Sequence, residues 1–98
     1  MYVGSLSLDL LLGDVASLKQ KRSVVRPIVA ELKRRHEVAA AETGHLDLHR
    51  RVQIGVAVTA GDAGHCRTVL EACERLVAGR PEVELLSARL RIWDDADE

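Results

Sequence analysis

Residues 51–60 repeat apolar and small or polar side chains with a strict period of two. The apolar members of this repeat are Val52, Ile54, Val56 and Val58. Because successive side chains of a β-strand point to opposite faces, this pattern predicts a strand with one buried face. A buried sheet face has to be covered by helices or by a second sheet. The segment therefore restricts the chain to a layered fold.

Similar periods predict the remaining elements of the fold. Alternation indicates strands at residues 2–12 and 83–93, and a shorter, alanine-rich strand from Val38 to Glu42. In the last strand the residues expected to point inward are Leu86, Ala88, Leu90 and Ile92. Helical spacing of apolar residues predicts a helix over Leu18–Arg35 and a second one between Asp62 and Gly79.

The resulting order is β-α-β-β-α-β, and both helices have one apolar face. We therefore expect an α+β, ferredoxin-like fold, with two helices packed on one face of a four-stranded antiparallel sheet. Residues 1–93 are expected to form a single domain. Residues 94–98 carry four acidic side chains and are expected to form a mobile tail.

Composition excludes several classes of protein. Phe is absent, and the chain has one Trp and one Tyr, so the core must be aliphatic. Cys66 and Cys73 fall two helical turns apart, too far to bridge, and are expected to be buried free thiols in a reducing cytoplasm. Neither a signal peptide nor a membrane-spanning apolar run is visible. We therefore expect a cytoplasmic protein without a membrane partner.

The stretch Ser17–Ser23 has an unusual placement of charge. Ser17 and Gln20 have the spacing of a capping box, which predicts the start of a helix. Lys19, Lys21 and Arg22 then occupy its first turns, where the helix dipole disfavours cations. Such a helix start suits an anion such as phosphate, although the same run could be a solvated face. Lys21 is unusual because it falls inside the apolar stripe.

Residues 17–36 contain seven Lys or Arg residues and one acid, Glu31, in a chain of net charge −1. We therefore expect an anion-binding or RNA-binding surface formed by Lys19, Lys21, Arg22 and Arg26. Pro27 removes a helical hydrogen bond to Ser23, so a kink or broken turn is expected there.

The motif Ser-Leu-Lys-x-Lys-Arg-Ser, here Ser17 to Ser23, resembles the YlxP-like family of small bacterial proteins. Further matching positions are Val24, Ala41, Glu42, Asp47, Gly55 and Ala57. The resemblance covers nearly the whole chain and implies a ferredoxin-like fold. It also implies a role near the ribosome or RNA, because the family's genes often lie beside those for translation initiation and ribosome maturation. Many members have Trp where this chain has His49, so a contact made by that Trp does not transfer.

The loop after the short strand offers two weaker candidates. His45, Asp47 and His49 have ligand chemistry, but no second cluster of ligands accompanies them, so no metal is expected. Glu42 and Asp47 could act together as carboxylates in an enzyme, or Glu42 could form a structural ion pair with Lys21 or Arg22. No phosphate-binding glycine loop or nucleophile motif occurs, so neither a cofactor nor catalysis is expected.

The sheet face turned away from the helices is predicted to be small and polar. Its expected members are Ser5, Ser7, Asp9, Gln53, Ala57, Thr59, Ser87, Arg89 and Arg91. Without an aromatic residue among them, stacking of RNA bases on this face is not expected. A flat face of this kind also suits a weak homodimer or a protein-interaction scaffold. The sequence thus favours a non-enzymatic RNA-binding or ribosome-binding module, with a homodimeric scaffold as the alternative.

Overall fold

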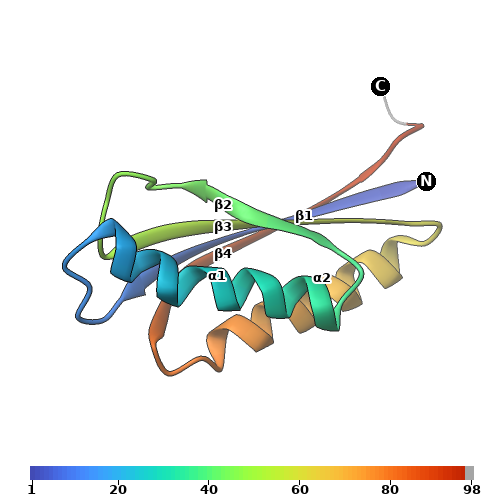
Figure 1. The fold of residues 1–98 in the computed structure, drawn as a ribbon. Coiled ribbons are helices and arrows are strands. Elements are labelled where there is room, and N and C mark those ends of the chain that lie inside the picture. The colour runs from blue at the N-terminus through green and yellow to red at the C-terminus, as the bar shows by residue number, and fades with distance from the viewer. Residues whose placement is uncertain (97–98) are drawn as a thin grey trace.

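The computed structural model describes residues 1–96 and contains four strands and two helices. The strands are β1 (Tyr2–Leu12), β2 (Ala39–Gly44), β3 (Arg51–Ala60) and β4 (Val83–Asp94). The helices are α1 (Leu18–Arg35) and α2 (Ala63–Ala78). Their order along the chain, shown in Figure 1, is the predicted β-α-β-β-α-β.

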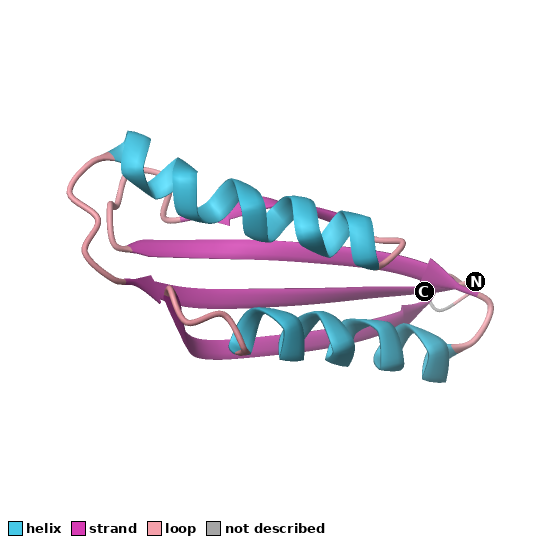
Figure 2. Cartoon of the chain, turned by 60° about the horizontal axis from the view of Figure 1, so that its bottom comes forward, coloured by secondary structure: helices cyan, strands magenta, loops and turns pink. Residues whose placement is uncertain are grey.

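The strands form one antiparallel sheet in the order β2-β3-β1-β4. Both helices lie on the same face of this sheet, as Figure 2 shows, and leave the other face open. The α+β, ferredoxin-like fold expected from the sequence is therefore confirmed. In this topology β2 and β4 are the two edge strands.

The core lies between the helices and the sheet and is aliphatic, as predicted. Leu6, Leu8 and Leu10 of β1 are fully buried, and the apolar side of β3 faces the helices with them. From α2, Cys66 and Cys73 join this core as free thiols, and burial raises the pKa of the Cys73 thiol. Burial of these aliphatic side chains is the main force that holds the helices on the sheet.

One local prediction is wrong, and one of the two alternatives expected near Ser23 is excluded. Leu86 does not point inward, because a bulge interrupts the β1–β4 register: Asp9 pairs with Ser87 but Leu10 pairs with Leu85. The extra residue, Leu86, is 46% exposed. The broken turn expected near Ser23 is also absent, since α1 runs without interruption from Leu18 to Arg35. Within this helix, the Ser23 hydroxyl donates a hydrogen bond to the Gln20 carbonyl at 2.6 Å.

The beginning of the acidic tail is held rather than free. Asp94 is the last residue of β4 and pairs with Tyr2. The Asp95 carboxylate lies 2.9 Å from the amino group of Met1, and its backbone N–H donates to the Met1 carbonyl. This contact raises the pKa of the N-terminal amine, chiefly through the hydrogen bond to Asp95. Residues 97–98 of the predicted tail lie outside the described residues.

Candidate functional site

The start of α1 is fixed by the predicted cap. Ser17 has extended backbone angles, and its hydroxyl accepts a hydrogen bond from the Gln20 N–H at 3.1 Å. The Gln20 side chain reaches back and accepts from the Ala16 N–H at 2.7 Å. These two bonds satisfy backbone groups that would otherwise be unpaired, and no acid occupies the first turn. The direction in which each cation of this segment points is thus set by the helix.

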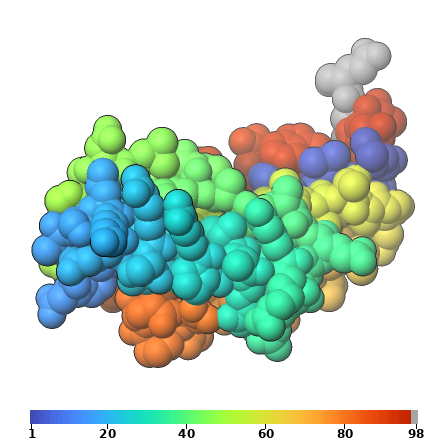
Figure 3. Space-filling model, viewed as in Figure 1, coloured from blue at the N-terminus to red at the C-terminus, as the bar shows by residue number. Residues whose placement is uncertain are grey.

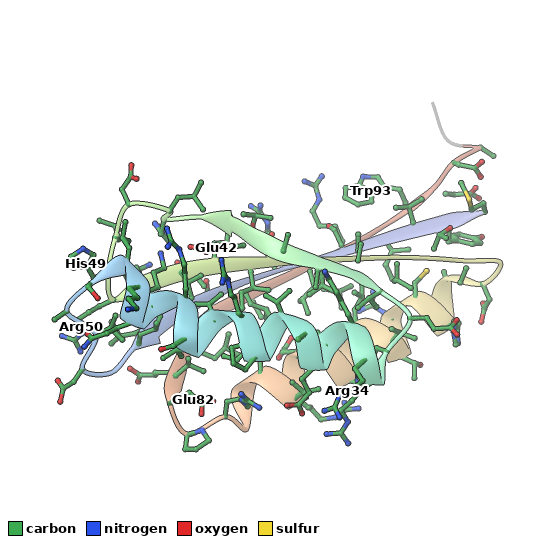
Figure 4. The ribbon with its side chains drawn as sticks, in the orientation of Figure 1. Arg34, Glu42, His49, Arg50, Glu82 and Trp93 are labelled. Atoms are coloured by element: carbon green, nitrogen blue, oxygen red, sulfur yellow. The ribbon has the colours of Figure 1, made fainter. Side chains whose placement is uncertain are left out.

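Lys21 points inward and is only 2% exposed. Its amino group lies 2.9 Å from Glu42 Oε1 and donates to the carbonyls of His45 at 2.7 Å and Leu48 at 2.8 Å. A lysine ammonium has three N–H donors, so these contacts use all of them. In Figure 4 the Glu42 side chain lies between β2 and α1. The structure therefore contains the Lys21–Glu42 ion pair that was one alternative in the sequence.

This ion pair organises the loop that joins β2 to β3. Lys21 binds the carbonyls at both ends of the turn from His45 to Leu48, in which the Leu48 N–H donates to the His45 carbonyl at 3.1 Å. His45 has a left-handed backbone conformation, with φ of 59°, which is costly for a residue other than glycine. At the far end of the loop, the Arg50 guanidinium donates to the carbonyls of Leu12, the last residue of β1, and of Gly13.

The prediction that Lys21 belongs to an anion-binding surface does not fit this geometry. Its amino group is enclosed and each of its donors already has an acceptor. A phosphate could reach it only by displacing Glu42 and two backbone carbonyls. Lys21 is therefore a structural cation.

The outer side of α1 carries a row of exposed cations, which we call the basic row. It consists of Lys19, Arg22, Arg26 and Lys33. The spacings of 3, 4 and 7 residues place all four on one face of the helix, over an axial length of about 21 Å. In Figure 3, α1 runs across the front of the molecule in blue to cyan, with β2 in green along its upper side.

The basic row has no internal neutralisation in residues 1–96, because none of its members forms an ion pair there. The acid of α1, Glu31, lies on a different side of the helix. Its carboxylate binds Arg80 at 2.6 Å and Arg35 at 3.2 Å. The positive charge of the row is therefore available to an external anion.

The surface beside the basic row is hollowed rather than flat. Near the start of α1, Ser23 and Pro27 line a shallow hollow together with Lys19, Arg22 and Arg26. Further along, Val25 and Val29 form the apolar part of a groove between α1 and Glu42 of β2. Lys33 was not among the predicted site residues, although its spacing from Arg26 of two helical turns would have identified it.

A second charged cluster lies on the open face of the sheet. The Arg51 guanidinium donates to Asp9 Oδ2 at 2.7 Å and thereby lowers the pKa of the Asp9 carboxyl. His45 Nε2 lies 3.5 Å from Asp9 Oδ1, which is too long for a good hydrogen bond. Within residues 1–96, Asp9 Oδ1 is buried without a hydrogen-bond partner.

The two predicted carboxylates do not come together in one hollow. Glu42 faces Lys21 and lines the groove beside α1, whereas Asp47 is exposed and lines a separate hollow with His49 and Arg50. Among residues 1–96, no cluster of three or more His, Cys, Asp or Glu side chains has the geometry to hold a metal ion. In this same range, neither helix has the length and hydropathy needed to cross a bilayer.

The open face contains an aromatic residue that the sequence analysis missed. Trp93 pairs with Val3 across the β1–β4 register, on the same side as Ser5 and Ser7, and is 43% exposed. The prediction that this face lacks an aromatic residue is therefore wrong. Extending the alternation of Arg89 and Arg91 by two residues would have placed Trp93 there.

The fold defines the class of protein: a small α+β domain with a ferredoxin-like sheet and two helices on one face. The chain belongs to the family described as "Protein of unknown function (DUF503)", whose model matches residues 3–90. It is similar to "Uncharacterized protein YlxP" of Bacillus subtilis (strain 168), with 24% identity over 82 residues, 84% of this chain and 89% of that protein. The YlxP-like resemblance seen in the sequence is thus confirmed.

Among solved structures, the chain is similar to a de novo designed protein with a ferredoxin fold, determined by solution NMR. The TM-score is 0.60 at 12% sequence identity, covering 100% of this chain and 91% of the designed one. At such low identity the likeness shows the fold alone. Function must therefore be argued from the surface of this chain.

Proposed function

We propose that this protein is a non-enzymatic RNA-binding module whose contact surface is the basic row of α1. The observation that carries the proposal is the row itself: four exposed cations on one helical face, without an ion pair in residues 1–96. Phosphates of a nucleic acid attract such a row and release counterions when they bind. The proposed contact surface keeps Lys19, Arg22 and Arg26 from the surface predicted from the sequence. It includes Lys33 in addition and leaves out Lys21, which is buried.

The net charge of −1 makes this attraction local rather than general. A phosphate chain that lies along α1 meets exposed cations over about 21 Å, although the chain as a whole has a net charge of −1. This supports a defined docking orientation on RNA, which a uniformly basic protein would not have.

The proposal is tested by fluorescence anisotropy with a labelled single-stranded RNA. Four phosphate contacts predict a slope of log affinity against log salt of about −3. The double variant Arg22→Glu with Arg26→Glu should lower affinity at least about tenfold and reduce that slope by about half, since two contacts are lost.

A matched control reverses the same total charge on the other helix. Arg67 and Arg75 are exposed on α2, so Arg67→Glu with Arg75→Glu changes the net charge by the same amount. If RNA binds through the basic row, this control should keep most of the wild-type affinity. Equal losses in the two double variants would show that only net charge matters, and an absence of RNA binding by the wild type would refute the proposal.

A further inference from the structure

Trp93 is the single tryptophan of the chain and lies on the open face of the sheet, which Figure 4 shows on the side away from both helices. It is 43% exposed although burial would remove a large apolar ring from water. The Arg91 guanidinium carbon lies 5.0 Å from the centre of its ring, a cation–π contact. Together the indole and the guanidinium present extended planar groups to solvent.

The surroundings of this pair leave room for a ligand. In the registers of β1 with its two neighbours, Val3 lies between Trp93 and Thr59, and Ser5 lies between Arg91 and Ala57. These neighbours are short, so no long side chain of β1 or β3 rises beside the ring. Arg89, two residues before Arg91, adds a further exposed cation to the same face.

The basic row and Trp93 border one continuous surface. Because β2 begins only at Ala39, which pairs with Ala57, the last residues of β3 have no strand on that edge. A hollow of about 590 Å³ occupies this place, and both Lys33 and Val3 line it. Lys33 ends the basic row, and Val3 pairs directly with Trp93. A chain molecule lying along α1 can thus pass around the sheet edge to the open face.

We infer that the open face at Trp93 and Arg91 binds an unpaired base of a single-stranded RNA whose phosphates lie along the basic row. This inference rests on the proposed function and adds the strandedness of the ligand. Bases of single strands stack on aromatic rings and on arginine guanidinium planes, whereas the bases of a duplex are already stacked. The path covers about 21 Å along α1 and about 10 Å across the sheet from β3 to β4.

Charge favours this occupant over a second copy of the chain. A two-fold symmetric contact whose axis passes near Trp93 would bring Arg89 and Arg91 close to the same cations of the partner. An RNA strand instead places phosphates near these cations and a base on the planar groups. Glu37 also lines the connecting hollow, so Glu37→Gln should strengthen binding by a small factor.

Because the chain has one tryptophan, its emission reports on this site alone. Titration with single-stranded RNA of about 4, 8 and 12 nucleotides should quench Trp93 emission and saturate together with the anisotropy signal. Trp93→Leu should weaken binding about tenfold without changing the salt slope, because stacking releases no counterions. Trp93→Phe should retain most of the affinity, and urea unfolding should confirm that both variants are folded.

Two further ligands separate this inference from the proposed function. An abasic sugar-phosphate strand and a duplex RNA should both bind the basic row, as anisotropy measures, but leave Trp93 emission unchanged. The Arg22→Glu with Arg26→Glu variant should bind more weakly yet reach the same quenching at saturation.

Single-stranded RNA that binds without quenching, together with wild-type affinity in Trp93→Leu, would overturn the inference while the proposed function stands. Emission that changes with protein concentration alone, and is unaffected by RNA, would assign the face to self-association and also overturn it. An absence of RNA binding by anisotropy would overturn both.

Discussion

The inner and outer sides of α1 use the same residue types for different purposes. Lys21 and Arg22 are adjacent in sequence, but a helix separates neighbours by about 100°. Lys21 is 2% exposed and binds one carboxylate and two carbonyls, whereas Arg22 is exposed and forms no ion pair within residues 1–96. The comparison shows that the charge run of the sequence is two features, a structural ion pair and a surface.

The two sides also differ in the cost of their charges. A buried ammonium must recover its lost hydration from protein partners, and Lys21 does so through three short contacts. Exposed cations keep their hydration and remain free to exchange counterions for phosphates. Stability should therefore depend on the inner side of α1, and RNA binding on the outer side.

The largest expected effect comes from removing the inner charge. Lys21→Met keeps the aliphatic stem but leaves Glu42 and two carbonyls without their donor, and should lower the free energy of unfolding by about 3 kcal/mol. Lys19→Met, the same change on the outer side, should alter it by less than about 0.5 kcal/mol. Urea denaturation measures both, and RNA affinity per folded molecule should fall only in Lys19→Met. The opposite pattern would make Lys21 a binding residue.

The fold was predictable because each of its main elements has a clear period. Alternation in β1 and β3 and the apolar stripe of α2 are local patterns that tertiary structure did not override. The predicted inward direction of Leu86 was wrong because a bulge in β4 adds one residue to the register. No local sequence pattern indicates where such an extra residue lies.

The candidate site was less predictable because it depends on contacts between distant segments. Helical spacing gives the direction of Lys21, but its three acceptors belong to Glu42, His45 and Leu48, which lie 21, 24 and 27 residues further along the chain. Sequence alone therefore left the ion pair and the anion site as alternatives. Trp93 was missed for a simpler reason: the predicted open face ended at Arg91, although alternation continues to the end of β4.

An intermediate effect should follow from reversing outer charges at the two ends of α1. Lys19→Glu places an anion in the first turn, where the helix dipole favours it, and should raise the free energy of unfolding by about 0.3–1 kcal/mol at low salt. Lys33→Glu, the matched change in the basic row near the other end, should lower it by a similar amount. Urea denaturation at low and high salt should show that both effects shrink with screening. If the free energy of unfolding changed in the same direction in both variants, net charge rather than the helix dipole would determine the effect.

The smallest expected effect concerns the ion pair of the open face and pH. Arg51 lowers the pKa of Asp9 below the usual 3.8, so the folded state binds fewer protons there than the unfolded state. The pair's contribution is therefore complete only above about pH 5 and is lost as the pH falls through the folded-state pKa. Because the side chains of Arg51 and Asp9 are 36% and 26% exposed, we expect only about 0.5 kcal/mol.

Asp9→Asn should accordingly lower stability at neutral pH and flatten its decline below pH 4, as chemical denaturation across that range would measure. Glu71→Gln on the exposed side of α2 is the control, since Glu71 forms no ion pair within residues 1–96. In this variant, stability should decline with falling pH as it does in the wild type. If Asp9→Asn destabilised the protein as much as Lys21→Met, charge pairs on the two faces of the sheet would be equivalent. Burial would then not explain why the Lys21–Glu42 ion pair contributes more to stability than an exposed one.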